Sequence, residues 1–559
     1  MIGPVPERPD SISIIPLGGV GEIGMNMTVI RSEEDLLVVD AGLMFPEEEM
    51  LGIDLVIPDT TYLLENRERI RGLVLTHGHE DHTGAVPFLL REISPPIYGT
   101  ALTLGLLGEK LREADLMEKA DLRCIKPKDQ VDLGNMTVEF IRVCHSIADG
   151  VGLAIRTRAG LVVHTGDFKL DQTPVDGQFT DLDRFADLGN EGVLVLLSDS
   201  TNADQEGSTP SEKSVGEAFE QIFRRAQRRI IVACFASNIH RIQQVFNVAA
   251  RLGKKVLING KSMVANTRIA SELGYLHIPN GTLVGLEEIK HLAPEKMLIL
   301  TTGSQGEPLS AIARMAMGEH KQIHVQPGDT VIISAKVIPG NEKSIARTIN
   351  HLFKRGAEVI YDEVSPIHVS GHPARDELKL ILNLVHPRFF VPIHGEYRHL
   401  HFHAALAEEM GIPRQNIFLP ENGDVFEFGP DFGRVAGKVT AGRVLVDGKG
   451  IGDVGDTVLR DRQHLSQDGM LVVVIGFDKQ TGAVVSGPEI ISRGFVYQKE
   501  SDELFEAARQ LVLTVLEGCS KDEKSEMEFI KPRIRNVLRK FLYREIKRRP
   551  MILPVIVEV

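Results

Sequence analysis

The sequence predicts an α/β protein in which one domain is inserted into another and a small third domain follows. Short β-branched runs such as SISIIPL and LLVVDAG dominate the beginning of the chain. From about residue 209, amphipathic helices alternate with apolar strands, which is typical of a parallel sheet covered by helices. A histidine-rich pattern of strands and loops returns near residue 366. The simplest account is one domain that the alternating segment interrupts.

We place the domain boundaries where these patterns change. The first domain covers residues 1–208 and resumes at residues 366–447, after an inserted domain at residues 209–365. The glycine-rich residues 448–465 are predicted to form a linker, and residues 466–559 a C-terminal α/β domain. A chain of 559 residues is too long for one core, which fits several domains.

The first two strands flank a glycine-rich stretch, GGVGEIG, at residues 18–24. Its Gly-x-Gly-x-x-Gly spacing superficially matches a dinucleotide-binding fingerprint. That fingerprint requires a helix after the glycines, so that the helix N-terminus can hold a pyrophosphate. Here the following MNMTVI is β-branched and typical of a strand. We therefore expect a tight turn close to the histidine cluster described below.

The inserted and C-terminal segments each show their own pattern. SEKSVGEAFEQIFRRAQRR reads as a helix opened by a serine cap, and the strand IIVACFA and the helix IHRIQQVFNVAARLG follow it. The C-terminal segment holds a predicted hairpin, two helices and a final apolar strand, MILPVIVEV. Because a sheet of only three strands exposes an edge, we expect this domain to join copies of the chain into a homodimer or tetramer.

The composition is that of an ordinary globular protein, with 43% hydrophobic and 25% charged residues. No apolar run approaches the roughly 20 residues that span a bilayer, and the N-terminus lacks an apolar signal core. The four cysteines are scattered without a Cys-x-x-Cys pair, which argues against a disulfide framework and a thiolate zinc finger. We expect a cytoplasmic protein with no membrane partner.

The net charge of −14 argues by itself against a nucleic-acid partner, because phosphates repel an acidic surface. However, net charge is an average over the chain. Residues 531–549 contain nine lysines and arginines and one glutamate. This stretch is consistent with either a solvated helix face or a local RNA-contacting surface.

The stretch LTHGHEDHTGA at residues 75–85 is rich in metal-binding side chains. On an extended loop after a strand, His77 and His79 point to one side, while Asp81 and His82 can turn toward another. This geometry suggests two adjacent metal sites, which need further ligands. Candidates follow other β-rich runs, where loop residues converge on one sheet edge. They are His145, Asp167 and His394.

These motifs resemble those of a known superfamily. THGHEDHTGA resembles the His-x-His-x-Asp-His signature of the metallo-β-lactamase superfamily, and Asp40, His145 and Asp167 match its other motifs. SDST, HVSGH and PIHGE around the insertion resemble the β-CASP nuclease subgroup, while PLGGVGEIGMN, LGIDLVIPD and the C-terminal domain resemble the bacterial ribonuclease J family. The resemblance covers essentially the whole chain. It implies a metallo-β-lactamase αββα sandwich interrupted by a β-CASP α/β domain, plus a small C-terminal α/β domain.

The resemblance implies two zinc ions per chain. The ligands of the first would be His77, His79 and His145, and those of the second Asp81, His82 and His394, with Asp167 bridging the two. Imidazole and carboxylate ligands suit zinc, and they also accept manganese. Asp40 would orient a ligating histidine from behind. Gly52, Asp54 and the distant Asp447 offer an oxygen-rich site, at which similar proteins suggest a structural calcium ion.

Further predictions concern catalysis and substrate binding. Asp81 would act with the metals, and His372, oriented by Asp199, would give a proton to the leaving 3′ oxygen. A phosphate would be held by side chains and backbone N–H groups of the HVSGH loop, which comprises His368, Val369, Ser370, Gly371 and His372. Ser237 and Asn238 lie at a strand-to-helix turn, where the helix N-terminus would attract the 5′ phosphate. An alternative is that Ser237 is a simple helix N-cap.

The resemblance implies a ribonuclease that acts on single-stranded RNA. It would remove nucleotides from 5′ ends that carry a monophosphate, cut RNA internally, and serve ribosomal RNA processing and mRNA decay, with an RNA-degradation complex as partner. The motifs also permit a DNA-repair nuclease of the Artemis-like branch or a small-substrate hydrolase such as glyoxalase II. The inserted domain disfavours the latter, because it would roof the site into a channel. A non-catalytic RNA-binding subunit predicts lost ligands, whereas all seven are present.

Overall fold

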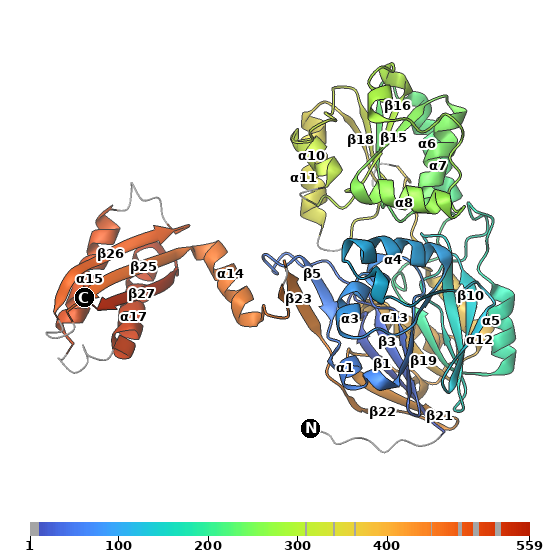
Figure 1. Ribbon diagram of the computed structural model, residues 1–559, viewed down its shortest axis with the longest axis horizontal. Coiled ribbons are helices and arrows are strands. Elements are labelled where there is room, and N and C mark those ends of the chain that lie inside the picture. The colour runs from blue at the N-terminus through green and yellow to red at the C-terminus, as the bar shows by residue number, and fades with distance from the viewer. Residues whose placement is uncertain are drawn as a thin grey trace. The chain divides into compact units, whose positions relative to one another are not determined.

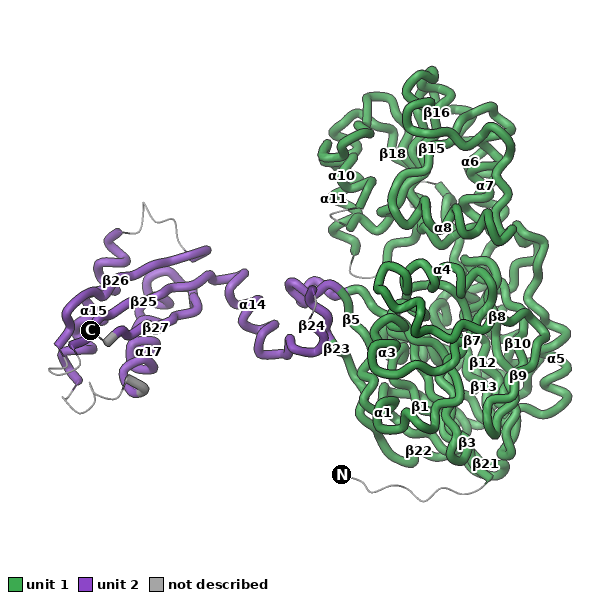
Figure 2. The backbone as a smooth tube through the Cα atoms, viewed as in Figure 1, with its two compact units in different colours: residues 1–45, 55–444 green, residues 46–54, 445–559 purple. Residues whose placement is uncertain are grey.

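Figure 1 shows a computed structural model of the protein, which describes residues 10–307, 310–338, 341–362, 365–448, 450–478, 483–495, 502–519 and 527–558. The chain divides into two compact units (Figure 2). The first combines residues 1–45 with 55–444, and the second combines residues 46–54 with 445–559. Within the described ranges, no helix has both the length and the apolar character needed to span a bilayer.

Two sheets form the base of the first unit. The larger has eight strands in the order β22-β21-β1-β3-β4-β6-β7-β8. These are β1 (Ile12–Gly18), β3 (Met27–Ser32), β4 (Asp35–Val39), β6 (Ile70–Val74), β7 (Ile97–Gly99), β8 (Leu122–Cys124), β21 (Asp424–Gly429) and β22 (Phe432–Lys438). The smaller has six strands in the order β19-β13-β12-β11-β10-β9. These are β9 (Gln130–Leu133), β10 (Met136–Val143), β11 (Gly150–Arg156), β12 (Leu161–His164), β13 (Val193–Asp199) and β19 (Phe389–Ile393).

Apolar side chains fill the space between the two sheets. One buried cluster takes residues from β1, β3, β4 and β6 of the larger sheet and from β10, β11, β13 and β19 of the smaller one. Strand β1 contributes Ile12 and Ile14 to this cluster, whereas its Ile15 and Leu17 pack on the opposite side of the sheet. Because side chains of a strand alternate between faces, an apolar outer face needs a covering layer as well.

Helices provide that layer on both outer faces, which confirms the predicted αββα sandwich. The larger sheet is covered by α1 (Thr61–Glu65), α3 (Val86–Glu92) and α4 (Ala101–Glu113). The smaller sheet is covered by α5 (Leu182–Glu191), α12 (Arg375–Val385) and α13 (Tyr397–Glu409). The segments that follow residue 366 therefore complete the sandwich, as the sequence predicts.

The inserted segment forms a separate parallel sheet of five strands in the order β15-β16-β14-β17-β18 (Figure 1). The strands are β14 (Ile230–Ala233), β15 (Lys255–Asn259), β16 (Met297–Thr301), β17 (Thr330–Ile333) and β18 (Glu358–Ile360). The helices are α6 (Lys213–Arg225), α7 (Ile239–Arg251), α8 (Lys261–Glu272), α9 (Leu286–Ile289), α10 (Ala311–Met317) and α11 (Glu342–Lys354). Ile230 and Val232 face the layer of α6, α7 and α8, while Ile231 and Ala233 face that of α10 and α11.

The insert and the sandwich share a core. Leu102 and Leu106 of α4 belong to the same buried cluster as the strands and helices of the insert. A Cβ atom on Gly105 would lie 2.9 Å from side-chain atoms of both Ile269 on α8 and Leu273 at the C-cap of that helix. This glycine therefore lets α4 and α8 approach closely. The contact places the insert beside the strand ends that carry the histidines and aspartates described below.

The second unit contains a three-stranded sheet in the order β26-β25-β27. Its strands are β25 (Met470–Phe477), β26 (Val484–Arg493) and β27 (Met551–Glu558), and α15 (Asp502–Glu517) and α17 (Met527–Ile546) pack on one face. Strand β27 pairs in parallel with β25 and lies at an edge, so the sheet has the exposed edge expected from the sequence. The segment predicted as a linker contains β24 (Gly450–Ile451) and most of α14 (Asp456–Asp468).

Candidate metal centre and phosphate loop

The predicted ligands meet at one edge of the sandwich because each follows a strand or a short turn. His77 and His79 follow β6, and the four-residue helix α2 (Glu80–Thr83) carries Asp81 and His82. The others follow β10, β12 and β19: His145, Asp167 and His394. Among the described residues, the ligand atoms form three groups, each with members within 4.8 Å of one another: His77, His79 and His145; Asp81, His82, Asp167 and His394; and Asp167, Asp199, His372 and His394.

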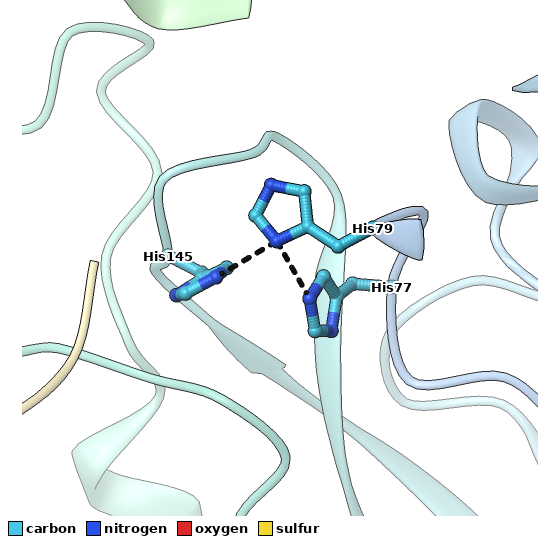
Figure 3. A group of neighbouring side chains, drawn as sticks. All are labelled: His77, His79 and His145. Carbon is cyan, nitrogen blue, oxygen red and sulfur yellow. Dashed lines mark hydrogen bonds between the residues drawn. The ribbon is translucent and has the colours of Figure 1, made fainter. Parts of the chain in front are cut away.

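In the first group, three histidine rings face a common point (Figure 3). His79 Nδ1 lies 3.0 Å from His77 Nε2 and 3.1 Å from His145 Nε2. The other nitrogen of His145 donates to the carbonyl of Gly371 at 2.7 Å, and that of His77 faces Thr76 Oγ1 at 3.1 Å. In the neutral rings of His77 and His145, the unprotonated Nε2 atoms therefore both point toward His79 Nδ1. Three such nitrogens are a donor set typical of a metal site.

Burial keeps this first group neutral. It lowers the pKa of His77 and of His145 well below the ordinary value, and it lowers the pKa of His79 to about 4. Positive charges on the neighbouring imidazoles would act in the same direction for His77. At neutral pH these three rings offer lone pairs and need lose no proton to bind a cation.

The second group mixes carboxylates with imidazoles. His82 Nε2 lies 3.2 Å from Asp167 Oδ2 and 3.6 Å from Asp81 Oδ2. His394 Nε2 lies 3.4 Å from Asp81 Oδ2. The same Asp167 oxygen is 3.8 Å from Nε2 of His77 and of His145, so this carboxylate reaches both groups.

Charge pairing dominates the second group. Burial lowers the pKa of His82, but the carboxylates of Asp167, Asp81 and Asp40 outweigh it and raise that pKa well above the ordinary value. Burial also lowers the pKa of His394, but the carboxylates of Asp167 and Asp199 outweigh it and raise that pKa to about 10. Burial would raise the pKa of Asp81, yet the imidazoles of His82 and His394 hold it well below its usual range. Without a metal, protons supply the positive charge that these carboxylates require.

Asp40 holds the second group from behind, as expected. Its Oδ2 lies 2.7 Å from His82 Nδ1, which leaves His82 Nε2 for a cation. Both oxygens also accept from Thr76, through the backbone N–H at 2.8 Å and the hydroxyl at 2.9 Å. The sequence analysis missed Thr76, although it directly precedes the histidine motif.

The glycine-rich turn also lies against this group, which confirms the turn predicted from the sequence. Gly19 has φ +84°, and a Cβ atom there would lie 2.3 Å from Asn26 Oδ1. The backbone N–H and the Nδ2 group of Asn26 both donate to the Asp81 carbonyl, at 3.0 and 3.1 Å, and Nδ2 lies 3.1 Å from His82 Nε2. Strand β2 (Val20–Gly21) pairs with β20 (Gly395–Glu396), directly after His394. The turn therefore braces both loops that carry the second group.

His372 and Asp199 form the expected pair. His372 Nδ1 lies 2.7 Å from Asp199 Oδ2, while Asp199 Oδ1 lies 3.3 Å from His394 Nδ1. Burial would raise the pKa of Asp199, but the imidazoles of His372 and His394 outweigh it and hold that pKa well below the usual range. The Asp199 anion thus accepts from His372 Nδ1–H and stabilises the imidazolium form, in which Nε2 carries a second, transferable proton. Its contact with His394 was not foreseen.

The HVSGH loop is fixed on its C-terminal side by the sandwich. Asn202 Nδ2 donates to Ser370 Oγ at 2.8 Å and to the His372 carbonyl at 3.0 Å. A Cβ atom on Gly371 would lie 2.6 Å from the His145 ring, so only glycine fits beside that ring. Val369 is buried in the core of the insert, and it can meet a substrate only through its backbone.

The insert fixes the N-terminal side of the loop through a buried ion pair. Arg241 donates through Nε and Nη2 to the Glu212 carboxylate, with both contacts at 2.9 Å. Its Nη1 lies 3.0 Å from His368 Nδ1, and burial together with this guanidinium holds the pKa of His368 well below its usual value. Because the guanidinium can only donate, His368 Nδ1 accepts, and the ring proton resides on Nε2.

At the strand-to-helix turn of the insert, Asn238 rather than Ser237 is the N-cap of α7. Its Oδ1 accepts from the Arg241 backbone N–H at 3.0 Å, and its side chain is buried. The N-cap alternative for Ser237 is therefore wrong. Ser237 is half-buried, and within the described residues its hydroxyl makes no hydrogen bond.

The residues predicted to bind calcium lie together in the second unit. Asp54 Oδ2 accepts from the Gly448 backbone N–H at 2.8 Å, and Asp447 pairs with the guanidinium of Arg462. A Cβ atom on Gly52 would lie 2.8 Å from Arg462 Nη1. The Arg462 side chain would have to leave Asp447 before Gly52, Asp54 and Asp447 could share a cation.

The sandwich, its parallel insert and the histidine-aspartate groups define a metallo-hydrolase of the metallo-β-lactamase fold with a β-CASP insertion. Four family models match: "Metallo-beta-lactamase superfamily" at residues 20–196, "Ribonuclease J, beta-CASP domain" at 227–352, "Zn-dependent metallo-hydrolase RNA specificity domain" at 356–420 and "Ribonuclease J C-terminal domain" at 457–559.

Curated relatives match over nearly the full chain. Ribonuclease J2 of Bacillus subtilis is 46% identical over 98% of this chain and 99% of its own. Ribonuclease J of Thermus thermophilus is 46% identical over 98% and 96%, and that of Helicobacter pylori strain 26695 is 41% identical over 97% and 79%. The chain therefore belongs to the ribonuclease J family, and it is a nuclease.

A solved structure supports the fold alone. A protein of unknown function from Enterococcus faecalis matches with a TM-score of 0.52 and 15% identity, over 74% of this chain and 99% of its own.

Proposed function

We propose that this nuclease acts on single-stranded RNA, releases nucleotides from 5′ ends that carry a monophosphate, and also cuts internally. The observation that carries the proposal is the position of two metal-type ligand groups directly beside the HVSGH loop, where the insert meets the sandwich. The relatives named ribonuclease J and the match to an RNA specificity domain support RNA as the substrate. The proposed roles are RNA maturation and decay in the cytoplasm, within an RNA-degradation complex.

The donor sets fit two zinc ions, and manganese is the alternative with the same ligand types. His77, His79 and His145 would hold one ion, and Asp81, His82 and His394 the other, with Asp167 shared. When bound, the two ions supply a water nucleophile at neutral pH and stabilise the negative charge that grows on the phosphate. We also propose the structural calcium ion at Gly52, Asp54 and Asp447, on condition that Arg462 moves away.

Proton transfer to the leaving group falls to His372. The Asp199 carboxylate accepts from His372 Nδ1 and fixes the ring orientation and tautomer. As the phosphorus–oxygen bond breaks, the proton on Nε2 passes to the 3′ oxygen of the leaving strand, and the ring then regains a proton from water. The Asp199 anion stabilises the ring whenever it is positively charged.

Phosphate recognition is divided between the loop and the insert. His368 presents an Nε2–H donor that Arg241 fixes, and Ser370 and Gly371 offer loop backbone beside the His145 ligand. Ser237, whose hydroxyl makes no hydrogen bond to the described residues, lies near the N-terminus of α7 and would take the terminal 5′ phosphate. A triphosphate brings extra bulk and charge, and it should fit this pocket poorly.

The C-terminal domain would assemble the chain into a homodimer or tetramer. Leu553, Val555 and Val557 of the edge strand β27 are 37%, 42% and 46% exposed. An apolar strand at an open edge is suited to pairing with a second copy. We keep the domain boundaries predicted from the sequence as part of this proposal, with residues 466–559 as the C-terminal domain.

One experiment distinguishes the proposed ribonuclease from a DNA-repair nuclease and from a non-catalytic RNA-binding subunit. End-labelled RNA with a 5′ monophosphate, triphosphate or hydroxyl is incubated beside matched single-stranded DNA, with and without a chelator. We expect chelator-sensitive release of mononucleotides from monophosphorylated RNA above all. Preferred cleavage of DNA would favour a DNA-repair nuclease, and no cleavage of any strand would favour a non-catalytic RNA-binding subunit.

A further inference from the structure

The outer face of α17 and the residues that follow it carry a dense positive charge. Helix α17 buries Ile530, Ile534, Leu538 and Leu542 against the C-terminal sheet, one residue per turn. The exposed basic residues around this stripe are Arg533, Arg535, Arg539, Lys540, Arg544, Lys547, Arg548 and Arg549. We call this set the α17 basic face.

Within the part of the chain that the structure describes, little of this charge is neutralised. Among the described residues, the ion pair between Arg544 and Glu545 is the only one that involves the α17 basic face. The neighbouring helix α15 carries four acidic residues, yet no described ion pair joins α15 to α17. On a protein with a net charge of −14, this cluster of basic side chains creates a local positive potential that attracts an external anion.

The face also contains an exposed aromatic ring among its cations. Tyr543 is 42% exposed. Lys547 Nζ lies 5.3 Å and Arg549 Cζ 4.5 Å from its ring centroid. These contacts order two flexible side chains. Basic side chains interleaved with an aromatic one are typical of surfaces that track a single-stranded nucleic acid.

We infer that the α17 basic face is a second RNA-contacting surface, which binds the sugar-phosphate backbone without sequence preference and outside the catalytic site. This inference rests on the proposed RNA substrate. An RNA long enough to reach both surfaces would bind more tightly, because binding at one surface raises its effective concentration at the other. A short RNA would occupy the catalytic site alone. The face would thus favour long transcripts over short cleavage products.

The magnitude follows from counterion release. Each phosphate contact to a single strand contributes about 0.7 to the slope of log affinity against log salt concentration. Removing three cations should lower that slope by about 2. Affinities that agree at about 1 M salt would then differ by about 100-fold at about 0.1 M salt.

The test uses the metal-loaded full chain and phosphorothioate-linked RNAs of two lengths, for example 30 and 6 nucleotides, with binding measured by fluorescence anisotropy across a salt series. The variant is Arg539→Gln with Lys540→Gln and Lys547→Gln, since these exposed side chains make no described hydrogen bond or ion pair. The matched control keeps the charge at the same positions: Arg539→Lys with Lys540→Arg and Lys547→Arg. Thermal unfolding of all three proteins checks that the fold is kept.

The inference predicts weaker binding and a smaller salt slope for the long RNA only, with the control like the native chain. Equal weakening for both lengths would place these residues at the catalytic site and overturn the second surface. Unchanged binding of both lengths would also overturn it, and would leave an acidic protein as the fitting partner of the face. If the native chain binds neither RNA, the proposed function itself fails.

Discussion

Replacing Asp199 with asparagine removes a buried negative charge while keeping the side-chain shape, and it reverses a hydrogen bond. In the native chain, Asp199 Oδ2 accepts from His372 Nδ1–H over 2.7 Å, and its negative charge stabilises the imidazolium, whose Nε2–H is the acid. An asparagine amide carries no charge and can donate to Nδ1 instead, which favours the neutral ring, and the Nε2–H of a neutral ring is a much weaker acid than that of an imidazolium. General acid catalysis contributes about 10²–10⁴ in rate, and we expect kcat on RNA to fall by that factor.

The assay compares two substrates. One is ordinary monophosphorylated RNA, and the other carries sulfur in place of the 3′ oxygen at the scissile bond. Sulfur leaves as a thiolate without a proton, so we expect the Asp199→Asn variant to cleave the second substrate within about tenfold of the native rate. His372→Gln serves as the matched control and should show the same pattern.

Asp199 also lies 3.3 Å from His394 Nδ1, so metal content must be measured in the same preparations. Equal losses on both substrates, with full metal content, would refute the assignment of Asp199 to proton transfer. A rate loss accompanied by missing metal would instead assign the residue to the support of His394.

The remaining predictions concern the metals, the 5′ end, the insert and the C-terminal domain. At pH 8, metal binding at the second group should release protons, because the pKa of His394 is raised to about 10, whereas His79, with a pKa near 4, releases none. Calorimetry in buffers of different ionisation enthalpy counts these protons, and equal release from both groups contradicts the assignment. Ser237→Ala should lower exonucleolytic release by roughly tenfold to a hundredfold, the cost of a hydrogen bond to a charged group, and should spare internal cutting of a 5′-blocked RNA. Equal loss of both activities would argue against a 5′ pocket. Arg241→Met should cost about 3–5 kcal/mol of unfolding free energy in urea, because it strands a buried carboxylate, and a change under about 1 kcal/mol would show that the pair is dispensable. Deleting residues 466–559 should give monomers in sedimentation that still hold their metals, and a truncated dimer would disprove assembly through this domain.

The sequence was enough to predict which histidines and aspartates cluster and how the layers are ordered, because both have a local signature. The His-x-His-x-Asp-His spacing specifies its own loop, and His145, Asp167 and His394 each follow a recognisable strand. Periodicity likewise separates the sandwich strands from the alternating insert, since a strand repeats every two residues and a helix every 3.6.

What could not be predicted depends on contacts between distant segments. Arg241 reads as an ordinary helix residue, yet it meets Glu212, 29 positions away, and His368, 127 positions away. Asn26 follows the glycines without any motif of its own, and it reaches Asp81 and His82 only because the turn folds back onto them. The N-cap of α7 could not be predicted for a similar reason. Serine and asparagine are both favoured at this position, and only the backbone geometry shows that Asn238 rather than Ser237 caps the helix.

The central claim is that two ligand groups each hold an ion that hydrolysis requires, and the metal content per chain of an active preparation tests it most directly. Elemental analysis of the native protein and of Asp81→Ala, beside their rates on monophosphorylated RNA, gives the answer. We predict two zinc or manganese ions per native chain, and one ion with activity lost in the variant, because Asp81 belongs only to the second group. An active preparation that contains no transition metal would contradict the account.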